Sequence, residues 1–244
     1  MIYGHHAVEA ALSRNMGEIT ALFIQENRKD ARTQQILKQA KTRKIPVCLT
    51  PRKVLDEMAA GMRHQGFILH CTNPNPALQS NLPTLLETLS EPALLLILDG
   101  VQDPHNLGAC LRSADGAGAH AIVAPRDRAV GLTPTVHKVA CGAAELVPFI
   151  QIVNLARSLD ELQIAGVEVI GLAADADEPL YNVPLAGPVA FVLGGESKGL
   201  RRLTRKGCNR LARLPMLGAT ENLNVSVTAG ICLYEACRQR HFSR

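Results

Sequence analysis

The fold of this chain is decided by the stretch Leu98-Asp99-Gly100-Val101-Gln102-Asp103-Pro104-His105-Asn106-Leu107-Gly108-Ala109-Cys110-Leu111-Arg112-Ser113-Ala114. The apolar run that leads into it, Ala93 to Leu98, predicts a fully buried strand. Asp99-Gly100 and Asp103-Pro104 break the strand, and a helix is expected from about Asn106, with Asn106 as its N-cap. Open α/β sheets bind ligands where a strand ends and a helix begins. Asn106 and Arg112, set among small residues, are therefore candidate site residues.

A second junction of this kind runs from Val192 to Leu200 and contains a glycine loop, Gly194 to Gly199. It is not a P-loop, because Leu200 stands where the phosphate-binding Lys is needed, and it lacks the G-x-G-x-x-G dinucleotide fingerprint. Gly195-Glu196-Ser197-Lys198-Gly199 does match the G-x-S-x-G nucleophile elbow. A serine hydrolase therefore stays an alternative, which requires the one downstream histidine, His241, to serve Ser197.

A third junction follows at Leu214 to Val227, where a strand again runs through a glycine-containing loop into a helix. Asn222, Asn224 and Ser226 are all suited to cap that helix, but one cap needs one such residue. The surplus favours a ligand loop. Because the carboxyl ends of parallel strands share one edge of a sheet, we expect the three junctions to form a single crevice.

The rest of the chain alternates strands and helices, which predicts an α/β fold with a mostly parallel sheet covered on both faces. The expected strands are 94–98, 121–124, 167–172, 189–193 and 211–214. The expected helices are 106–116, 135–144, 155–164, 199–205 and 223–240. The last helix is apolar over much of its surface, so we expect it to be buried against the sheet or a partner subunit.

The N-terminal part predicts a separate small α/β domain. Its expected helices are 5–12, 31–42 and 52–58, and its expected strands are 19–25, 46–50 and 66–71. A segment rich in Pro, Asn and Ser follows and reads as a linker. We therefore predict a small α/β domain over residues 1–72, a linker over 73–83 and a larger α/β domain over 84–244.

Composition narrows the classes of protein. The chain has 244 residues, 47% of them hydrophobic and 20% charged, which predicts a packed core rather than disorder. It shows neither an apolar stretch long enough to span a membrane nor a signal pattern. Seven cysteines, mostly among apolar neighbours and without C-x-x-C spacing, indicate reduced, buried thiols and a cytoplasmic location. The cysteines and histidines give no metal-ligand spacing.

Charge points to a polyanionic partner. The net charge is only +4, but six basic residues and no acid lie between Arg201 and Arg213. Smaller basic groups occur at residues 38–44 and at Arg126 and Arg128. Such groups suit a phosphate backbone, although each is also compatible with a solvated helix face. Aromatic residues make up only 3%, which disfavours binding by base stacking.

Taken together, the motifs resemble those of the SpoU (TrmH-type, SPOUT) ribose 2′-O-methyltransferases. The three family motifs occur in order, from Asp99 through Asn106 to Arg112, as Gly194-x-Glu196-x-x-Gly199, and from Pro215-Met216 to Ser226. Tyr3-Gly4-His5-His6-Ala7-Val8 and His64-Gln65-Gly66-Phe67 are similar to the small substrate-binding domain of the bacterial subgroup that methylates a guanosine ribose in large-subunit (23S) ribosomal RNA.

The resemblance implies a deep trefoil-knot methyltransferase domain preceded by a small L30e-like domain, with S-adenosyl-L-methionine as cofactor, ribosomal RNA as partner, and a homodimer. It also implies residue roles. The catalytic positions are Arg112, Asn106, Glu196 and Asn224, and the cofactor-binding positions are Gly194, Leu214, Leu223, Met216 and Gly199. Two positions depart from the family pattern: Asn222 stands where Ser is usual, and Ser197 where Gly is common. His5, His6 and His64 are assigned no chemistry.

The implied chemistry is direct methyl transfer, since a sulfonium methyl group is already an electrophile. The protein has to align the ribose 2′-oxygen and help to remove its proton. Arg112 is the family's proposed proton acceptor, but a guanidinium is nearly always protonated, so it can equally clamp a substrate phosphate. The alternatives are a transfer-RNA guanosine methyltransferase of the same family, an RNA-binding protein without activity, and the hydrolase.

Overall fold

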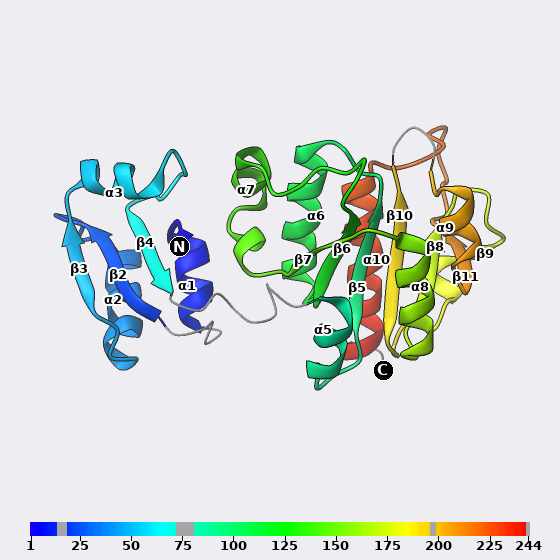
Figure 1. Cartoon of the computed structure of the whole chain (residues 1–244), viewed down its shortest axis with the longest axis horizontal. Coiled ribbons are helices and arrows are strands. Elements are labelled where there is room, and N and C mark those ends of the chain that lie inside the picture. Colours follow the sequence, from blue (N-terminus) through cyan, green and yellow to red (C-terminus); the bar gives the residue numbers. More distant parts are fainter. Residues whose placement is uncertain (14–18, 72–80, 196–198, 243–244) are drawn as a thin grey trace.

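The computed structural model describes residues 1–13, 19–71, 81–195 and 199–242, and within them the chain forms two β-sheets with helices packed on each (Figure 1). The described elements are, in chain order, β1 (Ile2–Tyr3), α1 (His5–Ser13), β2 (Ile19–Gln25), α2 (Ala31–Thr42), β3 (Val47–Thr50), α3 (Arg52–Ala59), β4 (Phe67–Cys71), α5 (Leu82–Thr88), β5 (Leu94–Asp99), α6 (Pro104–Gly116), β6 (Ala121–Pro125), α7 (Pro134–Ala140), η1 (Ala143–Glu145), β7 (Phe149–Ile152), α8 (Leu155–Ile164), β8 (Glu168–Leu172), β9 (Glu178–Pro179), η2 (Leu180–Asn182), β10 (Val189–Gly194), α9 (Arg202–Lys206), β11 (Arg210–Arg213) and α10 (Val225–His241).

The first sheet belongs to the N-terminal unit and has the strand order β1-β4-β2-β3. Strand β2 pairs parallel to β3 and antiparallel to β4. Helices α1 and α2 bury Val8 and Ile36 against one face, and α3 places Leu55 against Ile68 on the other. The small α/β unit expected from the sequence is confirmed.

The second sheet is parallel throughout and has the order β7-β6-β5-β10-β8-β11-β9. One core lies between the sheet and α6, α7 and α10, and a second lies between the opposite face and α5 and α8. All six residues of β5 are buried because both of its faces are covered. The predicted parallel sheet with two covered faces is therefore confirmed. The trefoil knot implied by the resemblance stays a prediction.

The prediction that Asn106 caps its helix was wrong. Helix α6 begins two residues earlier, at Pro104, and its cap is Asp103, whose Oδ1 accepts a hydrogen bond from the backbone N–H of His105 at 2.8 Å. Proline is favoured in the first turn of a helix because its φ is already helical and its missing N–H would have no intrahelical partner there. Asn106 is thereby freed for a different contact.

Other boundaries also differ from the prediction. Helix α7 ends at Ala140 rather than 144, because Cys141 and Gly142 take the left-handed conformation (φ 51° and 98°). Leu82 and Pro83, which the sequence assigned to the linker, form the first turn of α5. Helix α9 starts at Arg202, and the short strands β1, β7 and β9 were not predicted. Most of the linker lies outside the described residues.

The basic group at 201–213 is largely paired within the protein. Arg205 Nη1 lies 2.8 Å from Asp175 Oδ1, and Arg210 pairs with Glu168 and Glu178 at 3.0 and 2.9 Å. The acids come from other elements, which the local sequence could not reveal. These arginines tie the β8–β9–β11 edge of the sheet together, so less of the group is free for RNA than its sequence suggests.

All seven cysteines are free. Cys110 and Cys232 are buried, and burial raises the pKa of the Cys110 thiol to about 12. Cys48 and Cys141 are exposed, so the expectation that the thiols are buried holds for only part of the set. Among the described helices, none is both long and apolar enough to cross a membrane.

Candidate active site

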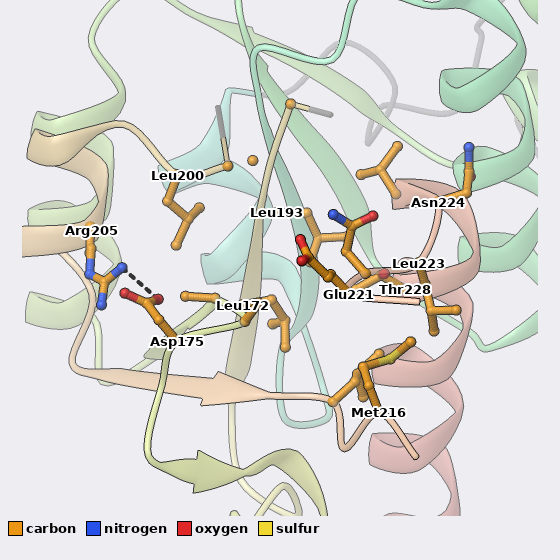
Figure 2. A pocket seen from close by; sticks show the side chains of 18 residues that line it. Leu172, Asp175, Leu193, Leu200, Arg205, Met216, Glu221, Leu223, Asn224 and Thr228 are labelled. Carbon is orange, nitrogen blue, oxygen red and sulfur yellow. Dashed lines mark hydrogen bonds and ion pairs between the residues drawn. The ribbon is translucent and has the colours of Figure 1, made fainter. Parts of the chain in front are cut away.

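A cavity of about 560 Å³ lies where β8, β10 and β11 end (Figure 2). Parallel strands present their carboxyl ends on this edge, where α/β sheets bind ligands. Leucine and methionine side chains supply apolar walls, and the backbone of the glycine loop supplies a polar side. The cavity is lined by Leu172, Ala173, Ala174, Asp175, Leu193, Gly194, Gly195, Gly199, Leu200, Arg205, Leu214, Met216, Glu221, Asn222, Leu223, Asn224, Val225 and Thr228.

Gly194 and Gly195 lie too close to other backbone atoms to carry side chains. A Cβ on Gly194 would lie 2.0 Å from the carbonyl carbon of Gly199, and one on Gly195 would lie 2.9 Å from the carbonyl oxygen of Gly100. The N–H of Gly199 donates to the carbonyl of Gly195 at 3.0 Å. These glycines therefore serve close backbone approach, and they leave backbone polar groups beside the cavity.

Asp99, the last residue of β5, hydrogen-bonds to the backbone on both sides of this loop. Its side chain is fully buried, and Oδ2 accepts a hydrogen bond from the backbone N–H of Arg201 at 3.2 Å. Its Oδ1 lies 3.3 Å from Arg201 Nε, an ion pair without hydrogen-bond geometry. The Asp99 carbonyl accepts from the N–H of Gly195 at 3.2 Å. The Asp99 side chain and carbonyl therefore bind the backbone on the two sides of the glycine loop, at Arg201 and at Gly195.

The first and third junctions meet through two amides. Asn224 caps α10, with its Oδ1 accepting from the N–H of Ser226 at 2.9 Å and from Ser226 Oγ at 2.6 Å. The Asn224 Nδ2 group donates to Asn106 Oδ1 at 3.0 Å. Asn106 is buried in the first turn of α6, so it holds Asn224 at the wall of the cavity.

Two acids and one base line the cavity. Asp175 is paired with Arg205, which lowers the pKa of the Asp175 carboxyl, while Asp175 raises the pKa of Arg205 (Figure 2). Glu221 has no ion pair in the part of the chain that the structure describes. Figure 2 shows its carboxylate reaching from the loop toward the middle of the cavity. This end of the cavity therefore suits hydroxyl or cationic groups of a ligand.

The predicted cofactor-binding residues come together. All five, Gly194, Leu214, Leu223, Met216 and Gly199, line the cavity. Of the predicted catalytic residues, Asn224 lines it and Asn106 reaches it through Asn224. Asn222, the departure from the family pattern, lines it as well, and its amide can both donate and accept. Glu196 and Ser197 lie outside the described residues.

Arg112 does not join this group. It lies six residues after Asn106 on α6, which places it about 120° around the helix. Its side chain is exposed, and its Nη1 lies 4.0 Å from Cys141 Sγ at the end of α7. Within one chain, Arg112 therefore does not line the cavity that Asn224 and the five predicted cofactor-binding residues line.

Sequence reasoning missed several residues of the site, above all Asp99 and Asp175. Each follows or ends a buried strand, and that signal could have identified them. His5 and His64, to which the sequence assigned no chemistry, each contact an acid: His64 is buried, with Nε2 2.8 Å from Asp56 Oδ1, and His5 Nε2 lies 3.8 Å from Glu9 Oε2. The His6 side chain lies outside the described part. No group of three metal-ligating side chains is found among the described residues.

Comparison with known families identifies the family to which this chain belongs. The family model described as SpoU rRNA Methylase matches residues 93–234, and the model for RNA 2′-O ribose methyltransferase substrate binding matches residues 1–77. The chain belongs to the SpoU methylase family. A relative from Coxiella burnetii, described as 23S rRNA (guanosine-2′-O-)-methyltransferase RlmB, is 50% identical over 98% of this chain and 95% of its own length.

Solved structures agree with that assignment to the SpoU family. A crystal structure described as RNA 2′-O ribose methyltransferase is 27% identical, with a TM-score of 0.69, and covers 98% of this chain and 88% of its own. The SpoU methyltransferase AviRb from Streptomyces viridochromogenes, solved with the cofactor AdoMet, has a TM-score of 0.71 at 20% identity and shares the fold over 100% of this chain and 91% of its own.

Proposed function

We propose that this SpoU methylase transfers a methyl group from S-adenosylmethionine to the ribose 2′-oxygen of a guanosine in 23S ribosomal RNA. The observation that carries the proposal is the convergence of the second and third family motifs on one cavity, with five predicted cofactor residues in its walls. The likeness to the Coxiella burnetii guanosine methyltransferase extends over nearly the whole of both chains, substrate-binding part included.

The cavity fits the cofactor. Its volume of about 560 Å³ lies in the range of small-molecule sites. Leu193, Leu214 and Leu223 offer an apolar slot for a purine ring, and the glycine-loop backbone can bond its polar edge. The Glu221 carboxylate can accept from ribose hydroxyls or from the methionine ammonium. When bound, S-adenosylmethionine supplies an electrophilic methyl group, so no covalent enzyme intermediate is needed.

The protein's part in the reaction is then alignment and charge stabilisation. Asn224, held by Asn106, is placed to orient the substrate ribose at the cavity wall. Arg112 is assigned to the substrate phosphate and to the negative charge that develops on the 2′-oxygen, because its guanidinium stays protonated. Glu196 is assigned to orient the nucleotide.

We further propose a homodimer, because the site is incomplete without a second copy. Arg112 lies away from the cavity of its own chain, so it can act only on a substrate that is bound at the cavity of a partner subunit. Helix α10 also exposes Val227 and Tyr234, at 49% and 54%, and the loop before it exposes Leu217. Exposed apolar side chains of this kind suit a subunit interface.

Mixing two inactive variants tests the shared site. Arg112→Ala and Asn224→Ala chains, co-refolded or subunit-exchanged, form heterodimers with one intact site if Arg112 acts across the interface. Activity then returns to roughly a quarter of wild type by random pairing. A mixture that stays inactive while sedimentation shows heterodimers would place Arg112 and the cavity in the same chain.

The hydrolase alternative is disfavoured by geometry. Val225 at the start of α10 lines the cavity, whereas His241 ends the same helix. Sixteen rises of an α-helix separate them by about 24 Å, so His241 lies far from the cavity that Gly195 and Gly199 line.

The deciding assay is transfer of labelled methyl from S-adenosylmethionine to 23S ribosomal RNA and, separately, to transfer RNA. Mapping by alkali-resistant linkages reports 2′-O-methylation. One resistant guanosine step in 23S RNA supports the proposal. Label in transfer RNA alone would assign a transfer-RNA substrate to the enzyme, and label in neither RNA favours an inactive RNA-binding protein.

The free thiols suit the cytoplasm, where we place the protein.

A further inference from the structure

A second cavity lies away from the methyltransferase cavity, between the N-terminal unit and the α7–η1 segment. Its volume is about 530 Å³. Tyr3, Arg63 and Gln65 come from the N-terminal unit, and Lys138 and Cys141 come from the end of α7. Figure 1 shows α7 on the side of the larger unit that faces the N-terminal one.

The two walls of this cavity are in direct contact beside it. A Cβ on Gly142 would lie 2.7 Å from the Cβ of Ala7 in α1. Leu146, which follows η1, is 8% exposed and belongs to the hydrophobic core of the N-terminal unit. The cavity is therefore a space left between packed surfaces.

A smaller cavity of about 380 Å³ lies next to it on the N-terminal unit. Met62, Arg63 and Gln65 line both cavities, so the two border the same side chains. Arg28 and Arg52 line the smaller one. We call the two cavities together the interdomain trough.

The trough carries positive charge that the protein itself does not neutralise. Two of its arginines are paired, since Arg28 Nε lies 3.0 Å from Asp30 Oδ2 and Arg52 Nε lies 3.8 Å from Asp56 Oδ2. Of its acids, Glu145 Oε1 lies 2.8 Å from His137 Nδ1, and Asp56 Oδ1 lies 2.8 Å from His64 Nε2. The Glu145 hydrogen bond raises the pKa of His137, which favours the protonated ring. Arg63 and Lys138, by contrast, have no ion pair among the residues that the structure describes.

Arg112 lies beside the same trough. Its guanidinium is 4.0 Å from Cys141 Sγ, and Cys141 lines the trough. The predicted catalytic arginine, which does not line the methyltransferase cavity of its own chain, therefore stands at the end of a positively charged path that crosses from one unit to the other. Tyr3 is the one aromatic side chain of the trough's described lining, so the path offers charge rather than a stacking platform.

We propose that the interdomain trough binds the sugar-phosphate backbone of the substrate RNA, with Arg63 and Lys138 contacting phosphates on the two sides of the boundary. The inference rests on the proposed function and assigns the path of the RNA that leads to Arg112. Uncompensated cations lining a groove attract phosphates by charge and counterion release, without reading base sequence.

Charge removal tests the path. The variant Arg63→Gln/Lys138→Gln is compared with Arg32→Gln/Arg157→Gln, which removes the same charge from exposed positions outside both cavities and outside the basic groups of the sequence. For a 23S RNA fragment at 0.15 M salt we expect about tenfold weaker binding for the trough variant, with the slope of log K against log salt lowered by about 0.7 per cation. The control variant and S-adenosylmethionine affinity stay near wild type. Equal losses in both double variants would overturn the trough.

The chain also carries its own footprinting pair. Cys141 lines the trough, whereas Cys48 is exposed on β3 outside it. Saturating RNA should slow alkylation of Cys141 at least fivefold and leave Cys48 unchanged, as measured by mass spectrometry of the two peptides. If wild-type protein methylates the RNA but Cys141 reacts equally fast with and without it, the trough is wrong and the proposed function stands. Failure of wild type to bind or methylate any RNA would remove both.

Discussion

The side-chain amide of Asn224 donates a hydrogen bond to Asn106 Oδ1 at 3.0 Å, joining residues 118 positions apart in sequence. The same Asn224 caps α10 through its Oδ1. One side chain therefore both starts the last helix and locks it to the first turn of α6, at the wall of the methyltransferase cavity.

Two substitutions separate these roles. Asn224→Ala removes the cap and the cross-link, and we expect the free energy of unfolding to fall by about 1 to 2 kcal/mol. Asn224→Asp keeps an acceptor for the Ser226 N–H, so its stability should stay closer to wild type, measured by chemical denaturation. Both variants should lose most methyl transfer, since neither presents the Asn224 amide. Full activity in the Asp variant would show that Asn224 acts only through its Oδ1, as a helix cap, and that its Nδ2 group is not needed for methyl transfer.

Arg112→Ala should abolish methyl transfer and leave S-adenosylmethionine binding nearly unchanged, because Arg112 does not line the cofactor cavity. Its exposed position predicts a stability change within about 0.5 kcal/mol. Calorimetric cofactor titration and the transfer assay measure the two effects separately. Arg112→Lys, which keeps the charge but not the planar fork, should recover only part of the rate. Parallel loss of cofactor binding and transfer would contradict a role confined to the substrate.

Gly194→Ala should open the glycine loop, because the added Cβ would meet the Gly199 backbone at 2.0 Å. We expect a loss of about 1 to 3 kcal/mol in stability and a weaker cofactor affinity. The matched control is Gly218→Ala in the neighbouring loop, where a Cβ meets nothing within 4 Å. Thermal unfolding with and without cofactor compares the two. Similar behaviour of both variants would show that the loop tolerates expansion.

The His137–Glu145 pair predicts a pH dependence of stability. Glu145 raises the folded-state pKa of His137 above its usual value of 6.5. The pair's contribution is therefore fully present below the unfolded-state pKa and is lost as pH rises through the raised, folded-state pKa. The melting temperature of wild type relative to Glu145→Gln should thus decline from pH 6 to pH 8.5. A constant difference over that range would mean that His137 does not titrate there.

Much of the fold could be predicted from the sequence. The bounds of α2, α8 and β2 agree with the predicted ranges because their periodicity and flanking breakers are local signals. The five predicted cofactor-binding residues, assigned from the resemblance, line one cavity because they lie at the end of β10 or in the segments that follow β10 and β11. Their role in binding the cofactor stays a prediction. The start of α6 was misplaced because Asp103-Pro104 competes with Asn106 as a cap, and local preference alone did not separate them.

What the sequence by itself determined is the set of elements, the parallel sheet and the motif residues, since hydrophobic periodicity and turn residues act over a few positions. Only the tertiary structure decided which of those residues meet. In the folded chain, arginines of the 201–213 basic group pair with acids from distant segments. Asn224 donates a hydrogen bond to Asn106, and Arg112 lies beside the interdomain trough. Side-chain partners depend on how elements cross in space, and that crossing is set by the packing of the whole core.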